Sequence, residues 1–78
     1  MASYSVSLTP RAVEDLREIP FPFRRQINQL FFKLKKNPRP AAAIVAADGT
    51  CRLPAWSWII LYDVDDSAGS IIILAIVS

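Results

Sequence analysis

The chain has 78 residues and a formal net charge of +2, with 53% hydrophobic residues and a single cysteine. This length predicts one domain, over residues 1–78, and argues against a multidomain enzyme. The longest apolar run, residues 71–77, is far shorter than the roughly 18 residues of a membrane span, so no membrane segment is expected. A lone cysteine excludes an intrachain disulfide and favours a reducing, cytoplasmic setting.

Charge is distributed unevenly along the chain. Residues 1–40 contain eight basic and three acidic residues, whereas residues 41–78 contain one basic and four acidic residues. A basic half suits an anionic partner, although the solvated face of a helix gives the same pattern. Both interpretations are open for the candidate RNA-binding residues Lys33, Lys35, Lys36 and Arg39.

The first forty residues predict a strand followed by two helices. Residues 4–8 alternate apolar and polar side chains, which is typical of a half-buried strand. Thr9-Pro10 favours a helix start, because threonine is a good N-cap and proline suits the first helical position. A second helix is predicted from about Pro22 to Lys36 by apolar residues at three- and four-residue spacing, and the prolines of residues 37–40 end it.

The rest of the chain predicts strands. Residues 41–47 are small and apolar, and Asp48-Gly49 is a hairpin-turn signal. A short strand is expected at residues 50–53, where Pro54-Ala55 interrupts it, and a longer one at residues 56–64. Residues 65–69 predict a turn, and residues 71–77 predict the last strand. The order β-α-α-β-β-β-β predicts an α+β fold, with a helical hairpin on one face of a mostly antiparallel sheet of four to five strands.

Other residues that carry chemistry in some proteins have simpler interpretations here. The chain has no histidine to activate Cys51, which is expected to pack as a small hydrophobic residue. Trp56 and Trp58 are expected in a core or an interface rather than stacked on nucleic-acid bases. Asp63, Asp65 and Asp66 precede a glycine and are typical of a turn. No metal or cofactor is therefore expected.

Short motifs follow one another in a recognisable order along the whole chain. They are Ser7-Leu8-Thr9-Pro10-Arg11-Ala12, Asp15-Leu16, Ile19-Pro20, Asn37-Pro38-Arg39-Pro40, Gly49 with Arg52-Leu53, and Trp58-Ile59-Ile60-Leu61-Tyr62-Asp63-Val64-Asp65-Asp66. In order and spacing they resemble the RelE/ParE superfamily of bacterial toxins from type II toxin–antitoxin systems. The resemblance implies a RelE-like fold and a cognate antitoxin protein that neutralises the toxin.

The resemblance also implies an activity. RelE-like members are endoribonucleases that cleave mRNA in the ribosome, whereas ParE-like members inhibit DNA gyrase. In the RelE group, cations around a concave sheet face stabilise the charge that develops when a 2′-hydroxyl attacks its phosphate. Arg52 is the one matching basic residue in the sheet half, which makes it the candidate catalytic residue. The alternative for Arg52 is a structural ion pair with Asp63 or Asp65.

Most other basic positions of the family are not matched. Residues 41–47, where lysines are common, read Ala-Ala-Ala-Ile-Val-Ala-Ala, and Pro54 and Ile59 stand where arginines are common. These departures predict weakened or absent mRNA cleavage. They leave open a non-catalytic protein that binds an antitoxin or itself.

Apolar residues occupy both faces of the predicted strands. A sheet covered by helices on one face normally alternates apolar and polar residues, but residues 58–62 and 71–73 do not. We therefore expect a second apolar sheet face, which an antitoxin segment or a second copy of the chain would cover.

Overall fold

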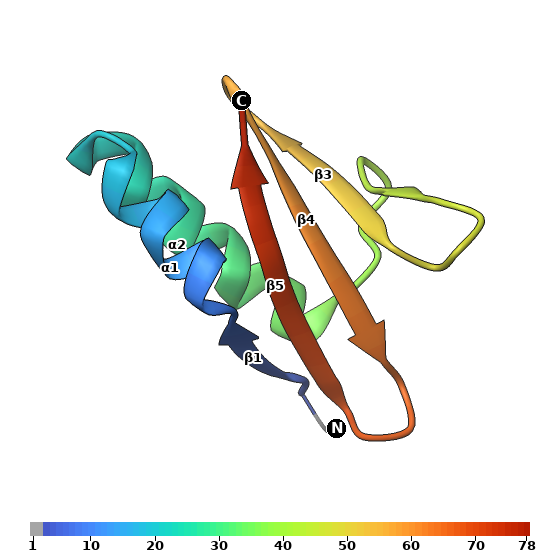
Figure 1. Ribbon diagram of the computed structural model, residues 1–78. Coiled ribbons are helices and arrows are strands. Elements are labelled where there is room, and N and C mark those ends of the chain that lie inside the picture. Colours follow the sequence, from blue (N-terminus) through green and yellow to red (C-terminus); the bar gives the residue numbers. More distant parts are fainter. Residues whose placement is uncertain (1–2) are drawn as a thin grey trace.

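The computed structural model describes residues 3–78, which form five strands and two helices (Figure 1). The elements are β1 (Ser5–Leu8), α1 (Pro10–Glu18), α2 (Phe21–Lys36), β2 (Ile44–Val45), β3 (Cys51–Ala55), β4 (Trp58–Asp65) and β5 (Ser70–Val77). The strands form one sheet in the order β1-β5-β4-β3-β2, and only the β1–β5 pair is parallel. The predicted α+β fold is confirmed.

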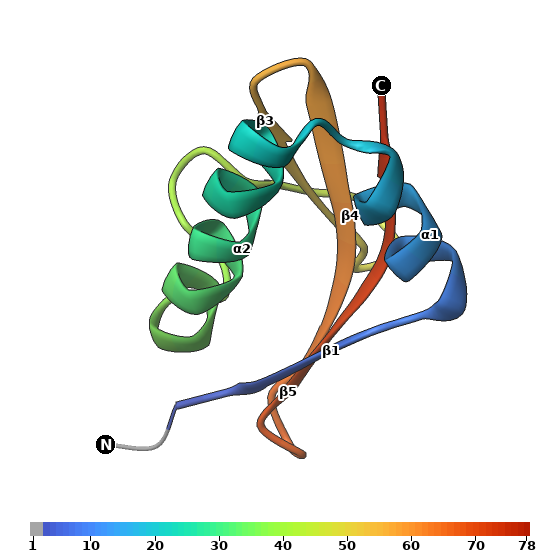
Figure 2. The same ribbon diagram turned by 90° about the vertical axis from the view of Figure 1, so that its left-hand side faces the viewer.

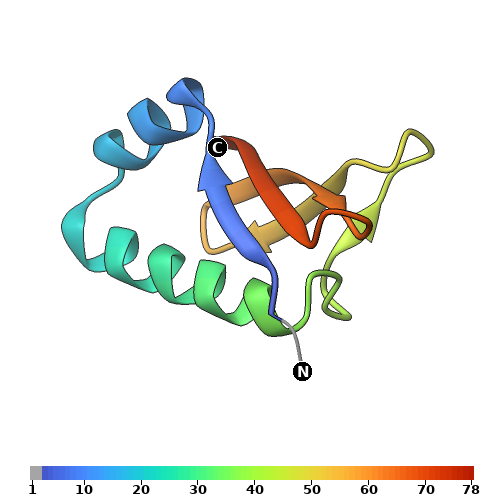
Figure 3. The same cartoon turned by 90° about the horizontal axis from the view of Figure 1, so that it is seen from below.

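Both helices lie on the same side of the sheet. Figure 2 looks onto α1 and α2 with the sheet behind them, and Figure 3 shows the two helices joined in a V beside the strands. The opposite face of the sheet carries no helix within residues 3–78. Neither helix in this part of the chain has the length and apolar character needed to cross a membrane.

The predicted start of α1 is confirmed, and it also attaches the helix to the sheet. Thr9 caps the helix, since its side-chain oxygen accepts a 3.1 Å hydrogen bond from the backbone N–H of Ala12. The same hydroxyl donates a 2.7 Å hydrogen bond to the carbonyl oxygen of Leu74 in β5. One side chain therefore fixes both the helix end and its position against the last strand.

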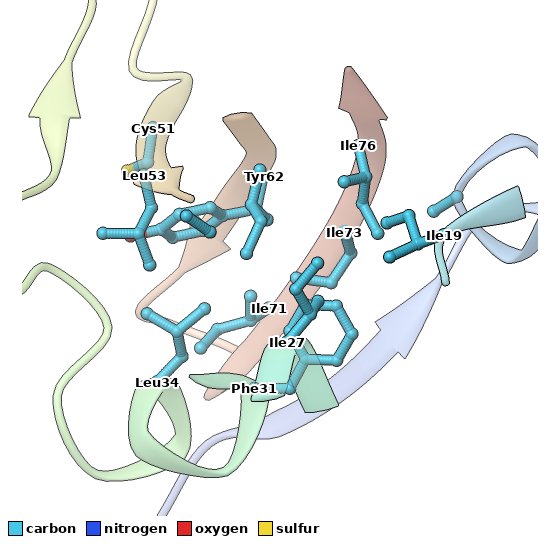
Figure 4. Close-up of a cluster of buried hydrophobic side chains, with 13 residues drawn as sticks. Ile19, Ile27, Phe31, Leu34, Cys51, Leu53, Tyr62, Ile71, Ile73 and Ile76 are labelled. Atoms are coloured by element: carbon cyan, nitrogen blue, oxygen red, sulfur yellow. The ribbon is translucent and has the colours of Figure 1, made fainter. Parts of the chain in front are cut away.

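The core lies between α2 and the sheet. The predicted apolar stripe of α2 buries Ile27, Phe31 and Leu34. Figure 4 shows these side chains meeting residues of β3, β4 and β5, among them Tyr62 and Ile73. Burial of such apolar side chains is the main stabilising contribution to a domain of this size.

Strand β5 contains an irregularity that changes which side chains face the core. Tyr62 of β4 pairs with Ile73, but Leu61 pairs with Ala75, so Leu74 is an extra residue in β5. Before this bulge the odd-numbered residues face the helices, and after it Ile76 does.

Three strand predictions are wrong in their limits. Residues 41–47 were expected to be a strand, but only Ile44 and Val45 pair, as β2. Pro54 was expected to interrupt the preceding strand, but it lies inside β3. Trp56 and Ser57, expected within the next strand, form the two-residue turn between β3 and β4.

The hairpin geometry explains why Pro54 is tolerated in β3. Ala55 pairs with Trp58 across the two-residue turn, so the next pair, Pro54 with Ile59, is a non-hydrogen-bonded pair. The nitrogen of Pro54 therefore points away from β4, toward the side of β3 where β2 has already ended. No ladder hydrogen bond is lost, because proline is placed where no donor is needed.

Candidate functional site

The sheet face away from the helices is the candidate site, and we call it the open face. Cross-strand pairing places its residues, because directly opposed residues point to the same side. Arg52 is opposed by Ile44, Leu61 and, through Leu61, Ala75, whereas Asp63 is opposed by Ile72. Its central residues are Ile44, Arg52, Pro54, Ile59, Leu61, Asp63, Ile72, Ala75 and Val77, and the same pairing adds Ser5, Ser7, Asp65 and Ser70 toward β1 and the β4–β5 turn.

The open face is mainly apolar and partly exposed. Ile44 is 62% exposed and Ile72 is 41% exposed, while Ile59 and Leu61 are half-buried. The predicted second apolar face is confirmed by this arrangement. Exposed apolar side chains that gather on one face of a small protein mark an interaction surface.

Arg52 is the basic residue of this face. Its side chain is exposed, and it forms no ion pair with any residue in the range 3–78. The expected alternative, an ion pair with Asp63 or Asp65, is therefore wrong. Asp65 instead accepts a hydrogen bond from the backbone N–H of Ala68, which confirms the predicted turn after β4.

Two of the positions where the resemblance leads one to expect arginines lie beside Arg52. Pro54 follows it on the same face of β3, and Ile59 is directly opposite Pro54 on β4. Ile44, from the segment where lysines are common, is directly opposite Arg52 on β2. Apolar side chains thus surround Arg52 where a phosphate-binding site would need cations.

The lysines named as RNA-binding candidates lie elsewhere. Lys33, Lys35 and Lys36 belong to the last turn of α2, and α2 is on the helix side of the sheet. The ammonium group of Lys35 lies 4.7 Å from the ring centre of Phe32, in a cation–π contact. The structure therefore does not bring these lysines together with Arg52.

Arg39, the fourth of these candidates, is held in an ion pair. Its guanidinium donates to both carboxylate oxygens of Asp66, at 3.2 and 3.1 Å, and the Tyr4 hydroxyl donates to the same carboxylate at 2.6 Å. The hydrogen bonds from Arg39 and then Tyr4 lower the pKa of Asp66 below its usual value. This group ties the start of β1 and the segment after α2 to the β4–β5 turn.

The two tryptophans gather at the end of the molecule where β3 turns into β4. The ring centre of Phe23 lies 6.3 Å from that of Trp56 and 5.4 Å from that of Trp58. Trp58 packs against the core, as expected, but Trp56 is 54% exposed and has a φ of +56°. The sequence showed the tryptophans but not their contact with Phe23, which depends on how α2 is placed.

The remaining reactive groups face the core. Cys51 is buried, as expected for a residue that packs rather than reacts. Burial raises the pKa of Tyr62 to about 12, and its hydroxyl donates a 2.7 Å hydrogen bond to the carbonyl oxygen of Pro38. Within residues 3–78, no group of three or more His, Cys, Asp or Glu residues is arranged to hold a metal ion.

Comparison with known families identifies the chain. Residues 6–78 match the profile of the family described as the ParE toxin of the type II toxin–antitoxin system parDE. The chain belongs to this toxin family. It is thus a member of the RelE/ParE superfamily and a toxin of the type II toxin–antitoxin class. No match was found among curated proteins.

Solved structures of RelE toxins share the fold of this ParE-family chain at low sequence identity. The RelBE2 toxin–antitoxin complex from Mycobacterium tuberculosis contains a chain that is 23% identical, with a TM-score of 0.85 and 96% of each chain covered. A chain in the RelE–RelB complex from the archaeon Pyrococcus horikoshii is 18% identical, with a TM-score of 0.85 and coverage of 96% of this chain and 93% of that one. The intact RelBE complex from E. coli contains a 16% identical chain, with a TM-score of 0.81 and coverage of 97% of this chain and 96% of that one.

Proposed function

We propose that this chain is a toxin that acts through protein binding in the bacterial cytoplasm and does not cleave mRNA. The observation that carries the proposal is the composition of the open face, where Arg52 is the single basic residue among apolar neighbours. Cleavage by a neighbouring 2′-hydroxyl needs a group that takes up a proton and several cations that stabilise the charged transition state.

Arg52 does not supply both requirements. A guanidinium stays protonated at neutral pH, so it binds phosphate but does not accept a proton. The chain has no histidine, and the tyrosine beside this part of the sheet, Tyr62, points into the core and keeps its proton up to high pH. Removing one stabilising donor typically costs about 10²–10³ in rate, and at least two positions beside Arg52 are apolar here.

The same face suits a protein partner. Three of the solved structures that share this fold are toxin–antitoxin complexes of RelE with RelB. By analogy, we propose a cognate antitoxin for this chain, with part of it lying across the open face. An apolar segment fits there, since burial of apolar surface stabilises association by about 25 cal/mol per Å².

Expression in a bacterial host tests this proposal. The chain is induced alone, with the adjacent open reading frame, or as Arg52→Ala, and mRNA is mapped by primer extension on translating ribosomes. We expect the neighbouring protein to co-purify with the chain, and we expect no new mRNA ends in any sample. Codon-specific cleavage that disappears in Arg52→Ala would overturn the proposal and restore Arg52 as a catalytic residue.

A second candidate function is inhibition of DNA gyrase. The match to the ParE family favours it, and the resemblance implies this target without any RNA-cleaving site. Purified chain added to a gyrase supercoiling reaction tests it directly. Inhibition that the antitoxin reverses would identify the toxic action, whereas unchanged supercoiling at saturating protein would exclude gyrase.

A further inference from the structure

Two charged side chains of the open face form no ion pair within residues 3–78. Arg52 is directly opposite Leu61, and Asp63 follows two residues later along β4, on the same side of the sheet. Both are exposed, and neither takes part in an ion pair with any residue in the range 3–78. One positive and one negative charge therefore lie next to the same apolar residue, Leu61, the first across the strand pair and the second along β4.

We propose that a second copy of this chain covers the open face and forms a two-fold symmetric dimer. In such an interface the same patch meets itself, so each contact occurs twice. A two-fold axis that lies in the interface, midway between Arg52 and Asp63, places Arg52 opposite Asp63 of the partner subunit. It places Asp63 opposite Arg52 of the partner subunit at the same time.

Charge complementarity favours this occupant over a nucleic acid. A nucleic acid would bind Arg52 but would be repelled by Asp63 and by Asp48 and Asp65 near it. A second copy satisfies both charges with residues already present, so neither is left unpaired when the interface forms. Asp48 and Asp65 lie at the edge and already accept hydrogen bonds from the backbone of Thr50 and Ala68.

The apolar part of the face supplies the rest of the interface. Ile44 and Ile72, its most exposed large apolar side chains, lie directly opposite Arg52 and Asp63, respectively. A standard interface buries about 800 Å² on each partner, which is roughly a sixth of the 5081 Å² surface of this chain. The half-buried centre of the open face, Ile59 and Leu61, is apolar.

The dimer does not depend on the proposed antitoxin, but it uses the same face. The free toxin thereby hides its apolar surface, and an antitoxin that binds the open face has to separate the two copies. Antitoxin binding is measured by co-purification and dimerisation by the mass of the purified chain, so failure of one is distinguishable from failure of the other.

Sedimentation velocity with light scattering on the purified full chain tests the dimer. At high micromolar concentration we expect twice the 8.7 kDa mass of one chain. Arg52→Glu alone and Asp63→Arg alone each place like charges together twice per dimer, so each weakens dimerisation by roughly hundredfold. The double variant R52E/D63R restores opposite charges and should return dimerisation to within about tenfold of the original.

Matched controls change the same charges on the helix side. Arg25 on α2 and Glu18 on α1 are exposed, so Arg25→Glu and Glu18→Arg should each leave the dimer intact. Thermal unfolding checks that every variant is folded. A monomeric wild type at high micromolar concentration, dimers that survive either single reversal, or a double variant that stays monomeric would each overturn the proposal.

Discussion

The carboxylate of Asp15 accepts a 3.0 Å hydrogen bond from the backbone N–H of Ile76, across 61 positions of the sequence. Thr9 makes a similar contact, with its hydroxyl donating to the carbonyl oxygen of Leu74. Both backbone groups lie in β5 beyond Ile73, where the pairing of β5 with β1 ends. Side chains at the start and middle of α1 therefore provide hydrogen-bond partners that the strand itself does not supply.

This contact predicts the effect of replacing Asp15. Asp15→Ala should lower the free energy of unfolding by about 1–3 kcal/mol, because the N–H of Ile76 loses its acceptor. Asp15→Asn keeps an acceptor oxygen and should cost less. Urea denaturation measures both. Arg11→Ala is the control, since the Arg11 side chain is largely exposed and its 3.5 Å ion pair with Asp15 contributes little. Equal losses for alanine and asparagine would contradict this account.

Tyr62 predicts how stability changes at alkaline pH. Its pKa is raised to about 12 by burial, above the value near 10 that tyrosine has in an unfolded chain. The neutral phenol is thus favoured in the folded state, and its contribution is complete below about pH 10 and lost as the pH rises through 12. We expect the free energy of unfolding, measured by urea denaturation, to fall over that interval. Tyrosinate absorbance reports the ionisation that accompanies the fall.

Tyr62→Phe separates this effect from other titrations. The variant should lose about 1 kcal/mol at pH 7, because the carbonyl of Pro38 loses its donor, and should show a weaker decline above pH 10. Tyr4→Phe is the matched control, since the Tyr4 hydroxyl binds the exposed carboxylate of Asp66. An unchanged alkaline decline in Tyr62→Phe would show that other groups cause it.

The parts of the fold that the sequence predicts are those set by local patterns. Thr9-Pro10 marks the start of α1, and the spacing of Ile27, Phe31 and Leu34 marks the buried side of α2. The bulge at Leu74 leaves no such mark, because residues 71–77 are apolar throughout and show no alternation that a shift would disturb. The tolerance of Pro54 in β3 likewise depends on where a different strand, β2, ends.

The candidate site was predictable only in part, for a similar reason. The apolar character of the open face was visible in the strand residues themselves. The separation of Arg52 from Lys33, Lys35 and Lys36 was not, because it depends on which side of the sheet α2 occupies. The engagement of Arg39 by Asp66 joins segments 27 residues apart and has no local signal.

The backbone at Trp56 predicts that this tryptophan contributes little to stability. Its φ of +56° is rarely adopted by a bulky residue and costs on the order of 1–3 kcal/mol. Trp56→Gly relieves that strain but loses the contact with Phe23, so the free energy of unfolding should change by less than about 1 kcal/mol. Trp58→Ala should cost about 3 kcal/mol. Similar losses in the two variants would contradict this difference.

We predict that the lysines of α2 do not take part in RNA binding. They lie on the helix side of the sheet, and Lys35 already contacts Phe32. Replacing Lys33, Lys35 and Lys36 by glutamine should leave retention on an RNA column unchanged at every salt concentration. A retention that falls steeply with salt in the wild type, and less steeply in the triple variant, would show that these lysines release counterions from RNA.

The extra residue in β5 reverses the side of the sheet to which each following side chain points. In a regular strand Ala75 and Val77 would continue the inward series of Ile71 and Ile73, and Ile76 would point outward. Because Leu74 is inserted, Ile76 enters the core and the two smaller side chains reach the open face. The chemistry of that end of the face is therefore decided by the one residue that the ladder leaves out; deleting Leu74 would make the strand regular and leave Ala75 and Val77 on the open face, whereas pairing Leu74 as an ordinary strand residue would turn both toward the helices.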